Sequence, residues 1–352
     1  MEKYVVLQDP SLDGLNEQIN KLSDKYAPVG NLIFADGKFV QQVCLTEEGE
    51  RLSREEESRG YSVVSDEQSF RKAIESGKSE IFFENDIVLS GSEKVVLSRP
   101  VTINLKGHSL SSTASVEVLR LEGGKVFIKN GKISSNVYKW VIIYKSGWME
   151  MQDVEVEGTY AIAGATGSNA EIRLIRCKLN GSKYAAAPVG GKFYASNTEF
   201  VSGSEAAFAG NGSADRPAVD GYFENCIFRA PERAAAVYWP TDDVVTFVKC
   251  DLEGGCAAYI KSGVVNFKGC SLKATAPKRP YESKGEGYEP TGDVVICDAC
   301  GYPKGDAEVS IVSSSFERLE ESCYDIAEYI KEGHESSQEI RMSPVLKAKV
   351  NF

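Results

Sequence analysis

The chain has 352 residues, a formal net charge of −11 and nine cysteines, which is enough length for one large domain and a small one. Its acidic balance argues against binding nucleic acid, which needs clustered lysine and arginine, and no stretch is long and apolar enough to span a membrane. The N-terminus lacks the basic, apolar and small-residue order of a classical secretory signal, so we expect the chain to fold in the cytoplasm.

Residues 1–45 are expected to form a small domain of their own. A strand, a helix with Leu15, Ile19 and Leu22 on one face, and two strands around the Asp-Gly pair at 36–37 give the order βαββ. Residues 1–44 thereby resemble a small βαββ domain of unknown function found in phage and bacterial proteins. Residues 46–64 are charged and nearly free of apolar side chains, and we interpret them as a linker.

A larger domain is expected over residues 65–335. It begins with a short amphipathic helix whose apolar face holds Phe70, Ala73 and Ile74. A six-residue motif then repeats along the chain. It consists of an apolar residue, two variable residues, a small residue, an outward-facing residue and a second apolar residue. The small position, the slot, is taken in turn by Asp86, His108, Gly131, Val154, Cys177, Thr198, Cys226, Cys250, Cys270 and Ser314.

The spacing of these slots indicates a solenoid. Successive slots lie 20 to 28 residues apart, except for one step of 44. A period of 20 to 28 residues is too short for a pair of helices and suits one coil of short strands. Glycine, serine and asparagine separate each copy of the motif from a second short apolar strand. We therefore predict a mainly β fold, a parallel β-helix of about nine to ten coils. The slot is expected to be an interior column with His108 in the core and Cys177, Cys226, Cys250 and Cys270 buried and reduced.

The start of this domain carries a family resemblance. "SFRKAIESGKSEIFFENDIVLSG" followed by "PVTINLKGHSLSS" resembles the entrance of the right-handed β-helices of the pectin-lyase-like superfamily, in which a short helix closes the first coil. That superfamily includes lyases, hydrolases, esterases, phage tailspikes and adhesins. The resemblance therefore implies a right-handed fold and leaves the activity open.

The C-terminal region is expected to close the last coil. "FERLEESCYDIAEYIKEG" (316–333) predicts a helix with one apolar side, and residues 336–352 are interpreted as a tail. The apolar side of that helix would hold Leu319, Cys323, Ile326, Ala327 and Ile330.

Candidate ligand-binding residues lie beside a stretch of small side chains. The second strands over 184–209 are rich in alanine, which predicts a flat outer wall on which a glycan, the N-terminal domain or a second copy could lie. Aromatic residues follow in the next coils and in the loop 275–293, and their rings suit stacking on sugars or packing at a protein interface. The candidates are Tyr238, Trp239, Tyr259, Lys261, Tyr281 and Tyr288.

Catalytic signals are few. Asp242 and Asp243 form the one adjacent acidic pair on the β-helix body, and an Asp-Asp pair after proline is more often a solvated turn. The Gly-His-Gly and Arg-Ile-Lys signatures of β-helix hydrolases are absent, as is the run of calcium-binding aspartates of the lyases. Two histidines give no catalytic triad, and we expect no metal and no cofactor.

Three functions remain open from the sequence. The favoured one is a non-catalytic structural or binding β-helix, a phage virion or tailspike-like component that binds a surface glycan or a partner protein, assembled as a homo-oligomer and most simply a trimer. The first alternative is a polysaccharide lyase or glycoside hydrolase that uses Asp242 and Asp243. The second is a cytoplasmic scaffold for protein interactions.

Overall fold

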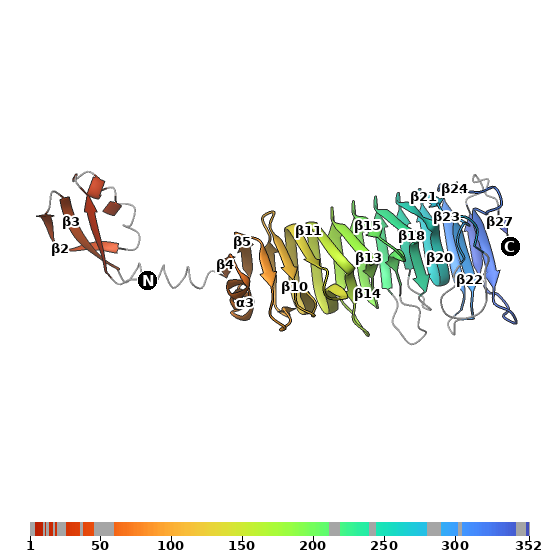
Figure 1. Ribbon diagram of the computed structural model, residues 1–352, viewed down its shortest axis with the longest axis horizontal. Coiled ribbons are helices and arrows are strands. Elements are labelled where there is room, and N and C mark those ends of the chain that lie inside the picture. The colour runs from red at the N-terminus through yellow and green to blue at the C-terminus, as the bar shows by residue number, and fades with distance from the viewer. Residues whose placement is uncertain are drawn as a thin grey trace. The chain divides into compact units, whose positions relative to one another are not determined.

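The structure is a computed structural model in which the chain divides into two compact units, Met1–Tyr61 and Ser62–Phe352 (Figure 1). It describes residues 4–9, 11, 14–16, 18–19, 26–35, 38–45, 60–210, 219–238, 244–279, 290–301, 305–342 and 350–351.

The N-terminal unit contains a three-stranded antiparallel sheet. Strands β1 (Tyr4–Asp9) and β2 (Tyr26–Ala35) both pair with β3 (Lys38–Leu45), which lies in the middle. Helical residues at 14–16 and 18–19 lie between β1 and β2, and Leu15 is buried. Ala35 pairs with Lys38, so the strands meet around the Asp-Gly pair. That pair, Leu22 and residues 46–59 lie outside the described residues.

The second unit begins with a strand where the sequence predicted part of a linker. Tyr61–Val64 forms β4, whose last carbonyl accepts a hydrogen bond from Glu84 N–H at 2.9 Å. Helix α3 (Glu67–Glu75) follows, with Asp66 as its N-cap in a reciprocal capping box with Ser69. Phe70 and Ala73 are buried and Ile74 packs against the same core, which confirms the expected apolar face.

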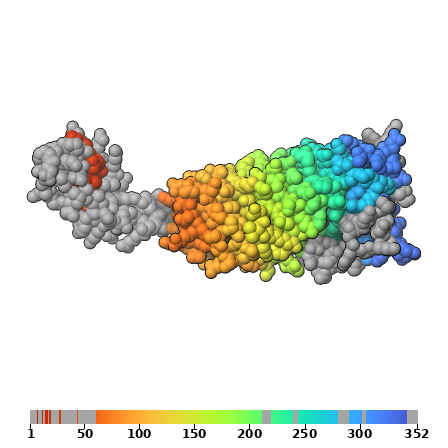
Figure 2. Space-filling model, viewed as in Figure 1, coloured from red at the N-terminus to blue at the C-terminus, as the bar shows by residue number. Residues whose placement is uncertain are grey.

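The rest of this unit is a right-handed parallel β-solenoid of about nine turns, as the sequence predicts. Every described strand pairing within it is parallel, and the colour bands of Figures 1 and 2 follow the coils along its axis. The strands of the first coils are β5 (Glu80–Phe83), β6 (Ile87–Leu89), β7 (Val96–Leu97), β8 (Val101–Asn104), β9 (Ser109–Ser112), β10 (Leu119–Ser135), β11 (Trp140–Gly164), β12 (Glu171–Ile175), β13 (Lys178–Ala187), β14 (Gly191–Ser196), β15 (Glu199–Ser202) and β16 (Ala206–Ala209). Those of the later coils are β17 (Val219–Glu224), β18 (Ile227–Tyr238), β19 (Val244–Val248), β20 (Asp251–Lys268), β21 (Ser271–Ala274), β22 (Val295–Ala299), β23 (Ala307–Val312), β24 (Ser315–Glu317), β25 (Ile326–Ile330), β26 (Glu339–Met342) and β27 (Val350–Asn351).

The predicted slot is an interior column over most of its length. Gly131 pairs directly with Val154, and the flanking registers carry the alignment through Cys177 to Ser314. From Val154 onward every slot side chain is at most 4% exposed. The four expected cysteines are free and buried. The thiols of Cys177, Cys250 and Cys270 donate to main-chain carbonyls of the preceding coil at 3.3 to 3.4 Å, so a small polar donor is satisfied at each step.

The first slots depart from the prediction. His108 is not a core residue, because its side chain is 35% exposed and its Nδ1 lies 3.6 Å from the Asp86 carboxylate, itself 69% exposed. The Asp86 carboxylate also accepts a hydrogen bond from Ser109 N–H at 2.7 Å. These two polar groups sit at the corner of the first coils, where they pair with each other and with solvent.

A left-handed residue before the slot turns the chain at each corner. Asn130, Asn197 and Asn225 have φ of 59°, 50° and 52°. Asparagine tolerates this region better than most residues because its short side chain can hydrogen-bond locally. The same conformation is adopted by Asp153, Arg176, Lys249, Gly269 and Ser313. This repeated backbone conformation explains why the period is maintained although the residues at this position differ between coils.

Phenylalanines fill the middle of the core in stacked columns. Phe247 stacks on Phe223 with ring centroids 5.1 Å apart and on Phe267 at 5.3 Å. Phe200 stacks on Phe228 at 4.7 Å with an interplanar angle of 4°. All five side chains are fully buried, and because their residues are direct strand partners, the parallel register itself creates the stacks.

The outer face of β13, β15, β18, β20 and β21 carries charges of alternating sign. Glu199 lies 3.5 Å from Lys178 and 2.9 Å from Arg229, and Lys273 lies 3.0 Å from Glu317. A parallel stack places equivalent positions about 4.8 Å apart, where like charges would repel. Alternating signs remove that repulsion and favour one register. The positive and negative side chains of this face therefore neutralise one another.

The expected C-terminal helix over 316–333 is wrong. Residues 326–330 form β25, which pairs in parallel with β22. Two residues of the expected apolar side are exposed instead, Leu319 at 56% and Ile330 at 46%. Pairing with an existing strand outweighed the helical spacing of the apolar residues. In the residues that the sequence had marked as a tail, β26 pairs with β23 and β27 pairs with β25, both in parallel.

Candidate functional site

The structure brings three of the sequence-predicted ligand residues together. The rings of Tyr238 and Tyr259 meet edge to face at 5.7 Å, and Lys261 Nζ lies 5.2 Å from the centre of each. Tyr259 is only 1% exposed, and its hydroxyl donates to the buried carboxylate of Asp298. A ring in that position is packed as core, which is a poor place for stacking on a ligand.

The other predicted residues cannot be placed beside this cluster. Trp239, Asp242, Asp243, Tyr281 and Tyr288 lie outside the described residues. The alanine wall next to the cluster is also less open than its composition indicates, since Ala206, Ala207 and Ala236 are each at most 1% exposed. These three side chains offer no open surface.

A polar groove of about 690 Å³ lies on the corner that follows β9, β15 and the equivalent strands of the coils between them. Five consecutive coils contribute to it, because Ser112 pairs with Ser135, and Gly158 pairs with Gly181, which in turn pairs with Ser202. It is lined by Ser111, Ser112, Thr113, Lys132, Ser134, Ser135, Asn136, Glu157, Gly158, Thr159, Asn180, Gly181, Ser182, Val201 and Gly203. Hydroxyl, amide and backbone groups therefore repeat along the solenoid axis.

Two glycines that line the groove allow close packing beneath it. A Cβ atom at Gly158 would lie 2.3 Å from a methyl group of Val141, and one at Gly181 would lie 1.9 Å from the Tyr184 carbonyl oxygen. Neither distance is possible for a real side chain. The chain can pack this closely here only because these positions lack a Cβ.

An aromatic ladder borders the groove. Trp140 lies 6.4 Å from Tyr160, and Tyr160 lies 4.9 Å from Tyr184, with Tyr138 5.6 Å from Trp140. Thr159 lines the groove and immediately precedes Tyr160 in the chain, so the two features are neighbours in the sequence of β11, and the ladder rings themselves are not among the residues that line the groove. All four rings are partly exposed. We call Trp140, Tyr160 and Tyr184 the aromatic ladder.

The charges around the groove are held in pairs. Lys132 contacts Glu157 and lies 3.4 Å from Glu155, and hydrogen bonding to Glu157 raises the pKa of Lys132. Lys183 lies 2.7 Å from Glu205, and this hydrogen bond raises the pKa of Lys183. Both lysines therefore remain ammonium ions with a carboxylate partner.

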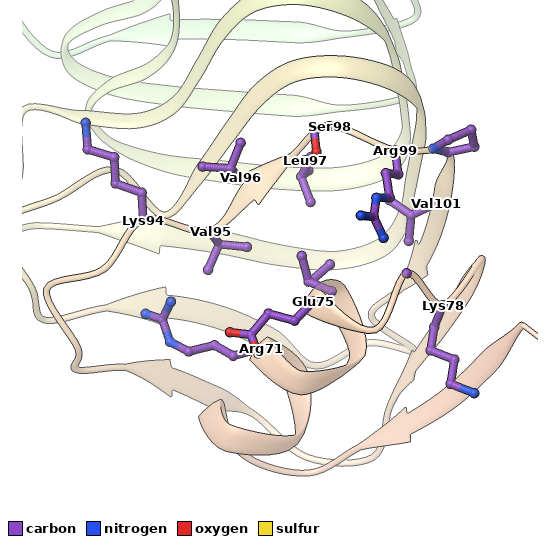
Figure 3. Close-up of a pocket in the computed structure, with 13 residues that line it drawn as sticks. Arg71, Glu75, Lys78, Lys94, Val95, Val96, Leu97, Ser98, Arg99 and Val101 are labelled. Atoms are coloured by element: carbon purple, nitrogen blue, oxygen red, sulfur yellow. The ribbon is translucent and has the colours of Figure 1, made fainter.

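A second hollow, of about 250 Å³, lies between α3 and the β7–β8 segment (Figure 3). Its apolar floor includes Val95 and Leu97, and Arg71, Glu75 and Arg99 are among the charged side chains around it. The residues that line it include no repeating row of hydroxyls. The groove is therefore the better candidate for an extended ligand.

Metal and membrane features are absent from the part of the chain that the structure describes. No three His, Cys, Asp or Glu side chains there come together as metal ligands would. None of the described helices has the length and apolar content that crossing a membrane requires.

Sequence reasoning missed both the groove and the ladder. The signal was present in the segments that follow the repeated motif: "SSNVYKW", "GTY" and "NGSKY" combine small polar residues with an aromatic one, and "SSTAS" has the small polar residues alone. These segments were interpreted only as turns. Their recurrence in four successive coils was the evidence that they form one surface.

Comparison with known proteins adds little to this picture. No protein-family model and no curated protein matches the chain. Among solved structures, it is similar to the catalytic domain of a GH87 α-1,3-glucanase in complex with tetrasaccharides, at 10% identity and a TM-score of 0.36, over 90% of this chain and 73% of that chain. Values this low assign no activity. What the structure itself establishes is a right-handed parallel β-solenoid.

Proposed function

We propose that the protein is a non-catalytic β-helix that binds carbohydrate in the polar groove, with the aromatic ladder as its stacking surface. The observation that carries this proposal is the adjacency of the two features. Partly exposed rings in a row offer apolar faces to sugar C–H groups, while the groove beside them offers hydrogen-bonding groups to sugar hydroxyls.

The absence of catalysis is supported by the carboxyl groups. Hydrolysis of a glycosidic bond needs one carboxylic acid that stays protonated and a second carboxylate. Wherever the described carboxyl groups have a perturbed pKa, that pKa is lowered, as in Glu171 and Asp306. Glu157, the carboxylate that lines the groove, is in contact with Lys132. These groups favour a binding role.

The test is a glycan array followed by calorimetry on the purified protein. Trp140→Ala is expected to weaken binding by about 30-fold, since losing an aromatic anchor costs roughly 2 kcal/mol. Trp148→Ala is the matched control, because Trp148 also lies on β11 but packs edge to face against Phe127 and is not part of the aromatic ladder. Equal losses in both variants, or no glycan bound by the wild type, would contradict the proposal.

Catalysis is tested in the same samples by assaying new reducing ends. We expect none from the wild type. If reducing ends appear, Asp242→Asn with Asp243→Asn and, separately, Glu157→Gln would show which carboxylates act, and the enzyme alternative would replace this proposal. A gene neighbourhood of capsid and tail genes would support the virion setting, and one of sugar-utilisation genes would oppose it.

A further inference from the structure

We infer that the groove selects a neutral, unbranched glycan chain that lies along the solenoid axis. This inference rests on the proposed carbohydrate-binding function and adds the class of ligand and its direction. Three features of the site carry it: its charge balance, its unused hydroxyl groups, and the spacing of its repeat.

The charge balance excludes strong attraction for an acidic chain. Lys132 and Glu157 are the two charged residues that line the groove, and they contact each other. Lys132 also neighbours Glu155, and Lys183, which follows the groove residue Ser182, lies 2.7 Å from Glu205. Another lysine, Lys139, lies over the rings of Trp140 and Tyr160, 5.0 and 4.9 Å from their centres. The lining of the groove therefore carries no net charge, so a uronate or sulfate group there would find no uncompensated cation.

The hydrogen-bonding groups suit neutral hydroxyls. The inward hydroxyls are already satisfied, as for Ser202, which donates to the Lys183 carbonyl at 2.7 Å. In the described part of the chain, the outward side chains of Ser111, Ser134 and Ser182 make no hydrogen bond. Serine hydroxyls both donate and accept, as sugar hydroxyls do, whereas an anion would use only their donors.

The direction of the ligand follows from the repeat. Parallel strands are about 4.8 Å apart, so five coils span about 19 Å along the axis. Tyr160 and Tyr184 have the same separation, 4.9 Å. A chain that follows the axis meets three rings in successive coils and a polar corner at each of the five coils, while a chain that crosses the axis meets one coil only.

The experiment compares linear oligosaccharides by calorimetry at two salt concentrations. Neutral chains are expected to bind with an affinity that rises with length until they span the five coils, and to show little dependence on salt. Uronate or sulfated chains of the same length are expected to bind at least tenfold more weakly. Tighter binding of acidic chains, lost in high salt, would overturn this inference and leave the carbohydrate-binding function intact. If no glycan of either class binds, both fail.

A charge variant sharpens the result. Glu157→Gln frees Lys132 from its groove-lining partner, so binding of an acidic chain should increase about fivefold while neutral chains change little. Glu253→Gln is the control, since Glu253 pairs with Arg229 and Lys273 on a later coil that does not line the groove. An equal response in the two variants would show that the groove's charge balance does not set its selectivity.

Discussion

Replacing Phe247 by alanine should show whether the stacked core holds the solenoid together. Phe247 is fully buried, stacks on Phe223 and Phe267, and meets Phe228 edge to face at 5.4 Å. Truncating a buried phenylalanine costs about 3–5 kcal/mol, and each aromatic pair adds about 0.5–1.5 kcal/mol beyond area burial. Phe208 also meets Phe247 edge to face at 6.4 Å, so four pairs are lost here and we expect a cost at the upper end, about 4–5 kcal/mol.

The assay is urea unfolding followed by far-UV circular dichroism. With a slope of about 3 kcal/mol per molar urea, the midpoint should fall by more than about 1 M. Tyr222→Ala is the control, because Tyr222 precedes Phe223 on β17 but points outward and is 42% exposed. It should cost less than about 1 kcal/mol. Similar shifts for the two variants would refute the assignment of inward and outward faces.

Two further predictions rest on the structure and a third on the sequence. Burial raises the pKa of the Cys177 thiol to about 11, so a thiol reagent at pH 8 should label it only after unfolding, and rapid labelling of the native protein would contradict the interior column. Burial alone would raise the pKa of Glu67, but hydrogen bonds from Ser90, Arg71 and Gly91 lower it to about 2. The stability that the ionised Glu67 contributes is present above pH 4.5 and should be lost as the pH falls towards 2. The substitution Glu67→Gln should remove that part of the acid dependence of the melting temperature. Light scattering is expected to report a homo-oligomer, and a monomer at high concentration would remove the trimer prediction.

The fold was predictable because packing and backbone conformation restrict which residue types can occupy two positions of each repeat. A small residue is needed in the slot because the corner is crowded, and a residue that tolerates positive φ is needed before it, as Asn130 and Asn225 show. Both requirements recur once per coil, so the period can be recognised even where equivalent positions hold different residues. The cap helix was equally predictable, since Asp66 and Ser69 cap it and Phe70 and Ala73 set its apolar face.

The C-terminal strand β25 was not predictable from the same rules. Cys323, Ile326, Ala327 and Ile330 have helical spacing, and nothing local excludes a helix there. The outcome depends on the neighbouring coil, because β22 presents a free edge with which Ile326–Ile330 pairs. Local pattern is a weak guide where a strand edge is already available.

The site was harder to predict than the fold. Tyr238 and Lys261 do lie together, but whether an aromatic residue near a turn points outward depends on register, and Tyr259 is buried. The groove needs Ser112, Ser135, Gly158 and Gly181 to align across coils, although they are distant in the chain. Their alignment becomes visible only when the turns are stacked with the same period as the strands.

The most direct test of the account is a crystal structure of the protein with a bound linear, neutral oligosaccharide. We predict sugar rings on Trp140, Tyr160 and Tyr184 in succession, with the chain parallel to the solenoid axis and its hydroxyl groups directed into the groove lined by Ser134 and Ser182. Sugar bound at the Tyr238–Lys261 cluster, or lying across the coils, would contradict it.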